Sequence, residues 1–166
     1  APQVHRGGGA TRTAGACRYP PAGHRSMAGA QPQLEFASLP PAEATRIVNQ
    51  EMLVVVMLET PKAIANADAI ARVEGVDGLL IGTSDLCAEM GIHGQLADPK
   101  VEDAYRAVIA ACRKHGKFPG MGGVYETKLM ERYVQLGMRM ILSGSDLSFI
   151  MAGAKARTDF LRSVKT

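Results

Sequence analysis

Two stretches of the sequence decide the fold class: VVVMLETPKAI at Val54–Ile64 and GLLIGTSDL at Gly78–Leu86. Each opens with an apolar run that is too short for a buried helix and suits a strand covered on both faces. Each run then passes into a segment with helix-start signals, which are Thr60 and Pro61 in the first stretch and Ser84 in the second. A buried strand followed at once by a helix, twice in succession, predicts a parallel sheet of the α/β class.

The same alternation continues in the second half of the chain. The segment Asp98–Gly116 has a capping aspartate, a proline in its first turn and a terminal glycine, so it predicts a long helix whose apolar stripe is Val101, Tyr105, Val108 and Cys112. FPGMGGV and RMILSG are expected strands, and a helical pattern follows each of them, with Ser145 as the expected cap of the last helix. About four or five βα units fit either an open doubly wound sheet or part of a closed (β/α)8 barrel, whose eight units need roughly 250 residues. These patterns leave both architectures open.

The composition indicates one folded domain preceded by a different kind of segment. The chain has 166 residues, of which 46% are hydrophobic and 21% charged, as in ordinary globular proteins. Residues 1–15, APQVHRGGGATRTAG, are rich in glycine, alanine and threonine without a hydrophobic period. We therefore expect a disordered or foreign leader at residues 1–15 and a folded domain at residues 16–166.

Charge, hydropathy and cysteine content disfavour several functional classes. The formal net charge is only +3, basic residues are spread along the chain, and aromatic residues make up 5%, which disfavours a nucleic-acid surface. No apolar run approaches the ~20 residues that span a bilayer, and the first residues lack the pattern of a secretory signal. The cysteines form no CxxC pair and are expected to be reduced thiols. We therefore expect a cytoplasmic protein without nucleic-acid or membrane partners.

Two carboxylates stand at the ends of the expected strands. Glu59 ends the first strand, and Asp85 follows the second. Since consecutive parallel strands usually lie side by side with their carboxyl ends at one rim, the two side chains can meet on one divalent cation. Mg²⁺ and Mn²⁺ prefer oxygen ligands, and Mg²⁺ keeps waters that a substrate can replace. The alternative is that Glu59 satisfies a helix N-terminus and that Asp85 is a helix-start carboxylate.

Neighbouring residues add weaker signals. Gly82 and Ser84 precede Asp85 in a strand-to-helix turn whose free backbone N–H groups can face an anion. The glycines of GMGGVY permit a close approach of the backbone to a ligand or to packed neighbours. Asp146, in SGSDLS, is either a third carboxylate at the rim or part of a helix cap.

The segment MLETPKAIANADAIARVEGVDGLLIGTSDLCAEMGI resembles the metal-dependent pyruvate aldolases of the HpcH/HpaI aldolase family, within the phosphoenolpyruvate/pyruvate-binding barrel superfamily. ACRYPPAGHR, HGKFPGMGGVY and SGSDLS extend the resemblance over residues 16–163. It implies a (β/α)8 TIM barrel, of which this chain would hold only the C-terminal four to five βα units. It also implies cleavage of 4-hydroxy-2-oxoacids, such as 2,4-dihydroxyhept-2-enedioate-like substrates, to pyruvate and an aldehyde through a metal-stabilised pyruvate enolate. The family usually assembles as a homo-oligomer, a hexamer or trimer of dimers, with the last helix exchanged between neighbours.

The resemblance also implies roles for particular residues. Glu59 and Asp85 would hold the divalent metal, which could be Mg²⁺, Mn²⁺ or Co²⁺. Backbone N–H groups of Ser84 and Asp85, in the turn that begins at Gly82, would bind the carboxylate of the 2-oxoacid substrate. No residue matches the arginine or the His–Asp pair that family members carry in the first half of the barrel, so the catalytic acid and base stay unassigned. Met57 stands where the family often has glutamine.

Two other functions stay open beside the aldolase. The chain could be a catalytically inactive truncated barrel that acts as an assembly module through its open sheet edges. It could also be an acyl-CoA lyase similar to the β chain of citrate lyase, which shares the pair of acidic metal ligands. The spacing of VEGVDGLLIG favours the aldolases over these lyases.

Overall fold

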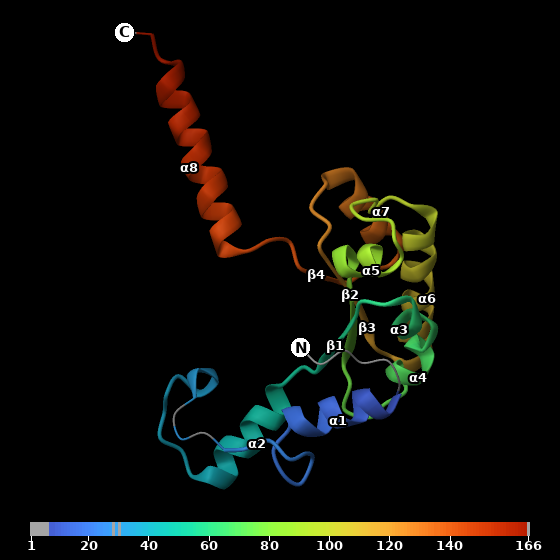
Figure 1. The fold of residues 1–166 in the computed structure, drawn as a ribbon. Coiled ribbons are helices and arrows are strands. Elements are labelled where there is room, and N and C mark those ends of the chain that lie inside the picture. Colours follow the sequence, from blue (N-terminus) through green and yellow to red (C-terminus); the bar gives the residue numbers. More distant parts are fainter. Residues whose placement is uncertain (1–6, 28, 30, 166) are drawn as a thin grey trace.

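A computed structural model describes residues 7–27, 29 and 31–165 of the chain. Its centre is a four-stranded parallel sheet in which the strands follow chain order (Figure 1). The strands are β1 (Val55–Leu58), β2 (Gly78–Gly82), β3 (Phe118–Gly122) and β4 (Met140–Ile141). Leu58 pairs with Ile81, and Gly82 pairs with Gly122, so the carboxyl ends of β1, β2 and β3 lie along one rim.

Helices follow each strand, which confirms the expected βα organisation. The helices are α1 (Gly7–Cys17), α2 (Pro41–Glu51), α3 (Pro61–Ala65), α4 (Ala67–Ala71), α5 (Thr83–Glu89), α6 (Pro99–His115), α7 (Thr127–Leu136) and α8 (Asp146–Ser163), with one 3-10 turn at η1 (Pro32–Leu34). Helices α3, α4 and α6 gather beside one face of the sheet (Figure 1). The core lies between this face and α6, whose stripe of Val101, Tyr105, Val108 and Cys112 is fully buried as the sequence predicts. None of the helices in the described part of the chain is long and apolar enough to cross a membrane.

On the opposite face of the sheet, strand β1 is less covered than the sequence suggests. Val56 and Leu58 are buried against the helices, whereas Val55 is half-buried and Met57 is 38% exposed. The expectation that this strand is covered on both faces is therefore wrong for the residues that the structure describes. The uncovered face is the one that a closed barrel turns toward its interior.

Several helix boundaries come from local capping. Thr60 accepts a hydrogen bond from the N–H of Ala63 at 3.1 Å, and Asp98 accepts one from the N–H of Lys100 at 2.8 Å. Gly116 ends α6 in the left-handed conformation, with φ 64°. The prediction that Ser84 caps the short helix is wrong, because α5 begins at Thr83 and makes no side-chain cap.

The predicted disordered leader differs from the structure over residues 7–15, which lie in helix α1. Ala10 and Ala14, one helical turn apart, are buried, and α1 packs on α4. Small side chains at this spacing let two helices approach closely, so alanine and glycine supply a packing face that hydropathy alone does not reveal. Residues 1–6 of the expected leader lie outside the described residues.

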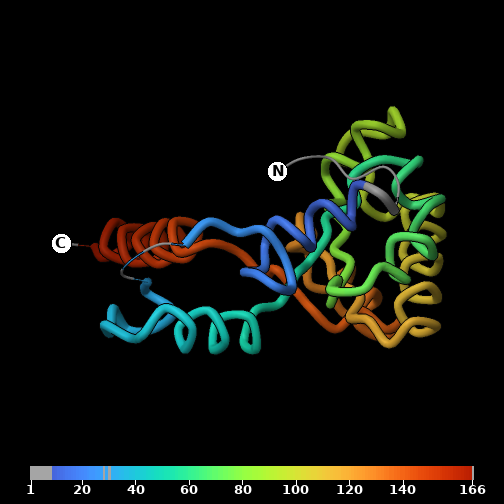
Figure 2. Tube along the Cα trace, turned by 90° about the horizontal axis from the view of Figure 1, so that it is seen from below, coloured from blue at the N-terminus to red at the C-terminus, as the bar shows by residue number. Residues whose placement is uncertain are grey.

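Helix α8 leaves the body of the molecule. Figures 1 and 2 show it extending away from the sheet and from α3–α7, and none of its residues is buried. Ser145 and Ser148 form a reciprocal capping box at its start, which confirms the predicted Ser145 cap. Its large apolar side chains are at least 58% exposed: Leu147, Phe149, Ile150, Met151, Phe160 and Leu161. Met151 therefore lies among the exposed side chains and not in the core.

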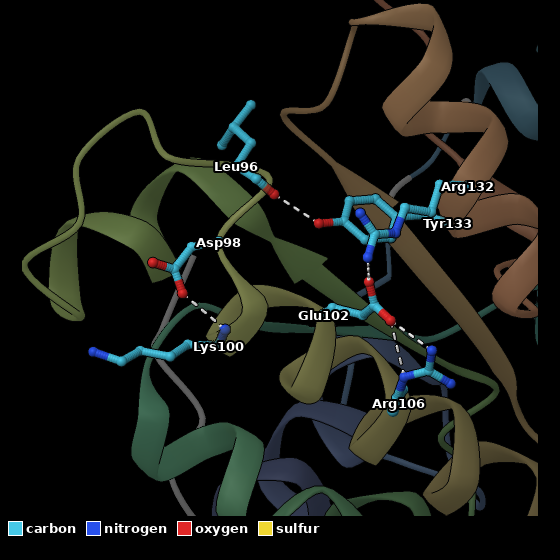
Figure 3. A network of polar contacts seen from close by, with 7 residues as sticks. All are labelled: Leu96, Asp98, Lys100, Glu102, Arg106, Arg132 and Tyr133. Carbon is cyan, nitrogen blue, oxygen red and sulfur yellow. Dashed lines mark hydrogen bonds and ion pairs between the residues drawn. The ribbon is translucent and has the colours of Figure 1, made fainter.

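A polar clamp joins α6 to α7. The Glu102 carboxylate pairs with Arg106 on its own helix and with Arg132 on α7, as Figure 3 shows. The hydrogen bond from Arg106 is the largest cause that lowers the pKa of Glu102, and the charge of Arg132 adds to it. Beside this clamp, the Tyr133 hydroxyl donates to the carbonyl oxygen of Leu96 at 2.6 Å (Figure 3). These contacts fix α7 on the helix that covers the sheet.

Candidate functional site

The two predicted carboxylates lie together at the rim of the sheet. Glu59 directly follows β1 and is half-buried, while Asp85 lies in the first turn of α5, directly after β2. Burial raises the pKa of Glu59, and both the charge of Asp85 and a side-chain hydrogen bond with it raise that pKa further. The two carboxyl groups are thus in direct contact. Like charges so close favour a shared proton or a shared cation.

Gly82 has no side chain, which makes room for the contact between Glu59 and Asp85. A Cβ atom at Gly82 would lie 2.7 Å from both Cγ and Oε1 of Glu59. Such a contact is too short for real Cβ atoms, so any larger residue at the end of β2 would displace the glutamate. Gly82, predicted as part of an anion-binding turn, therefore also gives the Glu59 carboxylate its place.

A second glycine shapes the other side of the turn. Gly123 has φ +82°, and a Cβ there would lie 2.8 Å from Oγ of Ser84 and 3.3 Å from its backbone nitrogen. The end of β3 therefore closes on the first turn of α5, whose backbone N–H groups lack partners within the helix. A cavity of about 190 Å³ opens here. It is lined by Met57, Glu59, Leu80, Gly82, Thr83, Ser84, Asp85, Gly122, Gly123 and Leu142.

Asp146 is not part of the site that Glu59 and Asp85 form. Its carboxylate accepts a hydrogen bond from the N–H of Leu147 at 2.8 Å in the first turn of α8, which agrees with the helix-start alternative. Among the described residues, no group of three or more histidine, cysteine, aspartate or glutamate side chains could hold a metal ion. The protein part of the rim site therefore consists of two acidic residues.

A buried polar group that the sequence patterns do not predict lies beneath this site. Thr83 is fully buried, and its hydroxyl contacts the Tyr105 hydroxyl and the Gly122 carbonyl oxygen, each at 2.7 Å. The available signal was a tyrosine in the apolar stripe of α6, since a buried tyrosine hydroxyl usually needs a polar partner. Spacing along the chain could not show that the partner of Tyr105 is Thr83, the residue before Ser84.

Curated proteins similar to this chain are named as aldolases. It is 38% identical over 156 residues to the 4-hydroxy-4-methyl-2-oxoglutarate aldolase tasA of Hapsidospora irregularis, and 92% of this chain and 58% of that protein are covered. It is 36% identical over 155 residues to the 4-hydroxy-2-oxo-heptane-1,7-dioate aldolase of Salmonella typhimurium (strain LT2), with 93% and 58% covered. The chain thus spans about 58% of the length of these relatives.

A solved structure agrees with this placement. The HpcH/HpaI aldolase from Desulfitobacterium hafniense DCB-2 superposes with a TM-score of 0.81 at 27% identity, covering 99% of this chain and 63% of that one. The fold is therefore that of a partial (β/α)8 barrel, with four βα units in the described residues. The family model for HpcH/HpaI aldolase/citrate lyase matches residues 1–152, a range that includes all of residues 1–15, the expected disordered or foreign leader. The chain belongs to the HpcH/HpaI aldolase/citrate lyase family, whose named members here are lyases.

Proposed function

We propose that this chain carries the metal- and pyruvate-binding half of an aldolase that cleaves 4-hydroxy-2-oxoacids to pyruvate and an aldehyde. The observation that carries the proposal is the contact between the Glu59 and Asp85 carboxyl groups at the strand tips. The names of the two aldolase relatives support the substrate class, because both describe 4-hydroxy-2-oxoacids with a second carboxylate.

The donor atoms fit a hard divalent cation. Two carboxylates supply only oxygen ligands, and an octahedral ion such as Mg²⁺ commonly takes one or two carboxylates and leaves its other positions to water and substrate. Glu59 and Asp85 would hold this ion. When bound, it would supply the positive charge that stabilises the enolate formed as the C–C bond of the substrate breaks. Oxygen ligands alone discriminate poorly among Mg²⁺, Mn²⁺ and Co²⁺.

Other residues of the chain would orient the substrate. Backbone N–H groups of Ser84 and Asp85 would donate hydrogen bonds to the carboxylate of the 2-oxoacid beside the ion. The glycine at 82 keeps the glutamate in place, and the glycine at 123 lets the end of β3 close on the turn. Met57 and Leu142 add apolar walls to the cavity, which exclude water from part of it. The acid and base that move protons in the whole protein stay unassigned.

The proposal extends to self-association through α8. The helix exposes six large apolar side chains along its length, far more than an isolated helix tolerates in water. We assign their cover to a second copy of the chain in a homo-oligomer, in line with the helix exchange that the family resemblance implies. Light scattering should show assembly that weakens when Phe149 and Ile150 are replaced by serine. A stable monomer of the unsubstituted chain would contradict this part of the proposal.

Pyruvate release from a 4-hydroxy-2-oxoacid tests the central proposal. With Mg²⁺ or Mn²⁺ present, the chain should release pyruvate, and Glu59→Gln should abolish the release and weaken Mn²⁺ binding at least about 100-fold. Glu51→Gln, an exposed glutamate at the end of α2, is the matched control and should leave both unchanged. Metal binding without pyruvate release would favour the assembly module, and turnover of a coenzyme A thioester would favour the citrate-lyase-like activity.

A further inference from the structure

A buried chain of hydrogen bonds runs beneath the rim site. The Thr83 hydroxyl lies 2.7 Å from the Gly122 carbonyl oxygen and 2.7 Å from the Tyr105 hydroxyl. The carbonyl can only accept, so Thr83 donates its single proton to Gly122. Tyr105 must then donate to Thr83. The chain therefore has a fixed direction, from Tyr105 through Thr83 to Gly122.

This chain ties three elements together. Tyr105 comes from the middle of α6, Thr83 is the first residue of α5, and Gly122 is the last residue of β3. Thr83 and Tyr105 are both inaccessible to solvent. Burial raises the pKa of Tyr105 far above its usual range, so its hydroxyl keeps the proton that it donates. Loss of either hydroxyl would leave a buried polar group without its partner.

The chain sits directly under the residues assigned to the site. Thr83 is flanked by Gly82, over which Glu59 lies, and by Ser84 and Asp85. Gly122 precedes Gly123, whose bare Cα faces Ser84. A shift of Thr83 would therefore move Asp85 relative to Glu59 and Ser84 relative to the end of β3.

We propose that Thr83 and Tyr105 are positioning residues, whose hydrogen-bond chain holds the strand-to-helix turn so that Asp85 stays beside Glu59 and Ser84 beside Gly123. The proposal rests on the proposed function for what the site binds, but the order of the turn is a property of the chain itself. Both hydroxyls belong to side chains that are inaccessible to solvent. Both act through the backbone of the turn.

The molecule supplies a matched control in Tyr133. Its ring stacks on that of Tyr105, with centroids 4.0 Å apart, and it is equally buried. Its hydroxyl donates to Leu96 rather than to the turn, as Figure 3 shows. Tyr133→Phe therefore removes a partly buried hydrogen bond from the same aromatic stack and leaves Thr83 unchanged.

Two measurements on four variants test the proposal. The variants are Thr83→Val, Thr83→Ser, Tyr105→Phe and Tyr133→Phe. Backbone ¹⁵N relaxation of the metal-free chain should give rigid Ser84 and Asp85 amides, with order parameters near ~0.85, falling toward ~0.6 in Thr83→Val. Calorimetric titration of pyruvate with Mn²⁺ should show about tenfold weaker binding for Thr83→Val. Thr83→Ser, which keeps the hydroxyl, and Tyr133→Phe should match the unsubstituted chain in both measurements.

Tyr105→Phe keeps the test decisive if Thr83→Val fails to fold, because it preserves the aromatic stack and should loosen the same two amides. Unchanged order at Ser84 and Asp85 in a folded Thr83→Val or Tyr105→Phe variant would overturn the proposal. Equal loosening in Tyr133→Phe would overturn it too, because it would show a general loss of stability. If the unsubstituted chain fails to bind pyruvate, the proposed function fails, and the relaxation data decide the positioning role alone.

Discussion

Side chains at the rim of the sheet contact other parts of the chain, whereas the large apolar side chains of helix α8 lie in solvent. At the rim, two carboxylates, two glycines and a buried threonine come from β1, β2, α5 and β3, and each has its place fixed by a neighbour within the chain. Helix α8 has a well-capped start, but its apolar side chains lie in solvent. Helix α8 begins with a capping box, whereas α5 at the rim has no side-chain cap. A helix can therefore be well capped while its apolar side chains remain in solvent, because only packing against another segment buries an apolar face.

The largest predicted difference is in the free energy of unfolding, when one isoleucine in the sheet and one on α8 are each replaced by alanine. Ile81, in the centre of the sheet, is fully buried, and Ile150, on α8, is 66% exposed. Ile81→Ala should lower the free energy of unfolding by about 2–5 kcal/mol, because it leaves a cavity in the core. Ile150→Ala should change it by less than about 0.5 kcal/mol in the monomer.

Urea unfolding at a concentration where the chain is monomeric measures both values. A large loss from Ile150→Ala under those conditions would mean that α8 packs on its own body. That result would remove the contrast between the two regions.

A smaller effect should follow from filling the space under the glutamate. Gly82→Ala places a Cβ 2.7 Å from Cγ and Oε1 of Glu59, so the glutamate must move away from Asp85. We expect Mn²⁺ affinity to fall about tenfold, as for lost support of a metal ligand. Gly153→Ala is the control, because nothing lies within 4 Å of its new Cβ on α8. Equal Mn²⁺ affinity in both variants would show that the position of Glu59 does not depend on the absence of a side chain at Gly82.

Metal binding at the rim should also depend on pH. Burial and the neighbouring Asp85 raise the pKa of Glu59, so this carboxyl holds its proton to a higher pH than an ordinary glutamate. A cation must displace that proton, and affinity should therefore fall as pH falls through the raised pKa, by at most about tenfold per pH unit. Mn²⁺ titrations from about pH 7 to pH 4 measure this slope. In the metal-free chain, Asp85→Asn should lower the raised pKa of Glu59, because it removes the negative charge next to that carboxyl group.

The smallest predicted effect is on stability without metal. A carboxyl whose pKa is raised by folding stabilises the chain only below its unfolded pKa, and that contribution is lost as pH rises through the folded value. At neutral pH the ionised Glu59 beside Asp85 therefore opposes folding. Glu59→Gln should raise the free energy of unfolding of the metal-free chain by at most about 1 kcal/mol, since the site is partly solvated. Urea unfolding should show this gain at pH 7 and a smaller one near pH 4, whereas a loss at pH 7 would contradict the repulsive pair.

Sequence reasoning predicted much of the fold because its signals are local. Caps at Thr60, Asp98 and Ser145, and the stop at Gly116, each depend on atoms a few residues apart, and the structure has all four. Ser84 was the wrong cap because the helix begins one residue earlier, where Thr83 turns inward to Tyr105 and Gly122. The expected leader was wrong over residues 7–15 because alanine packing leaves a weak hydrophobic pattern.

The sequence by itself determined the alternation of strands and helices, and it placed Glu59 and Asp85 directly after two neighbouring parallel strands. Backbone periodicity and capping contain that information, since both act within a few residues. Only the tertiary structure decided that Glu59 lies over Gly82, that Thr83 bonds to Tyr105 and Gly122, and that α8 lies away from the body. These features depend on how side chains from distant segments fill shared space, and no spacing along the chain encodes that directly.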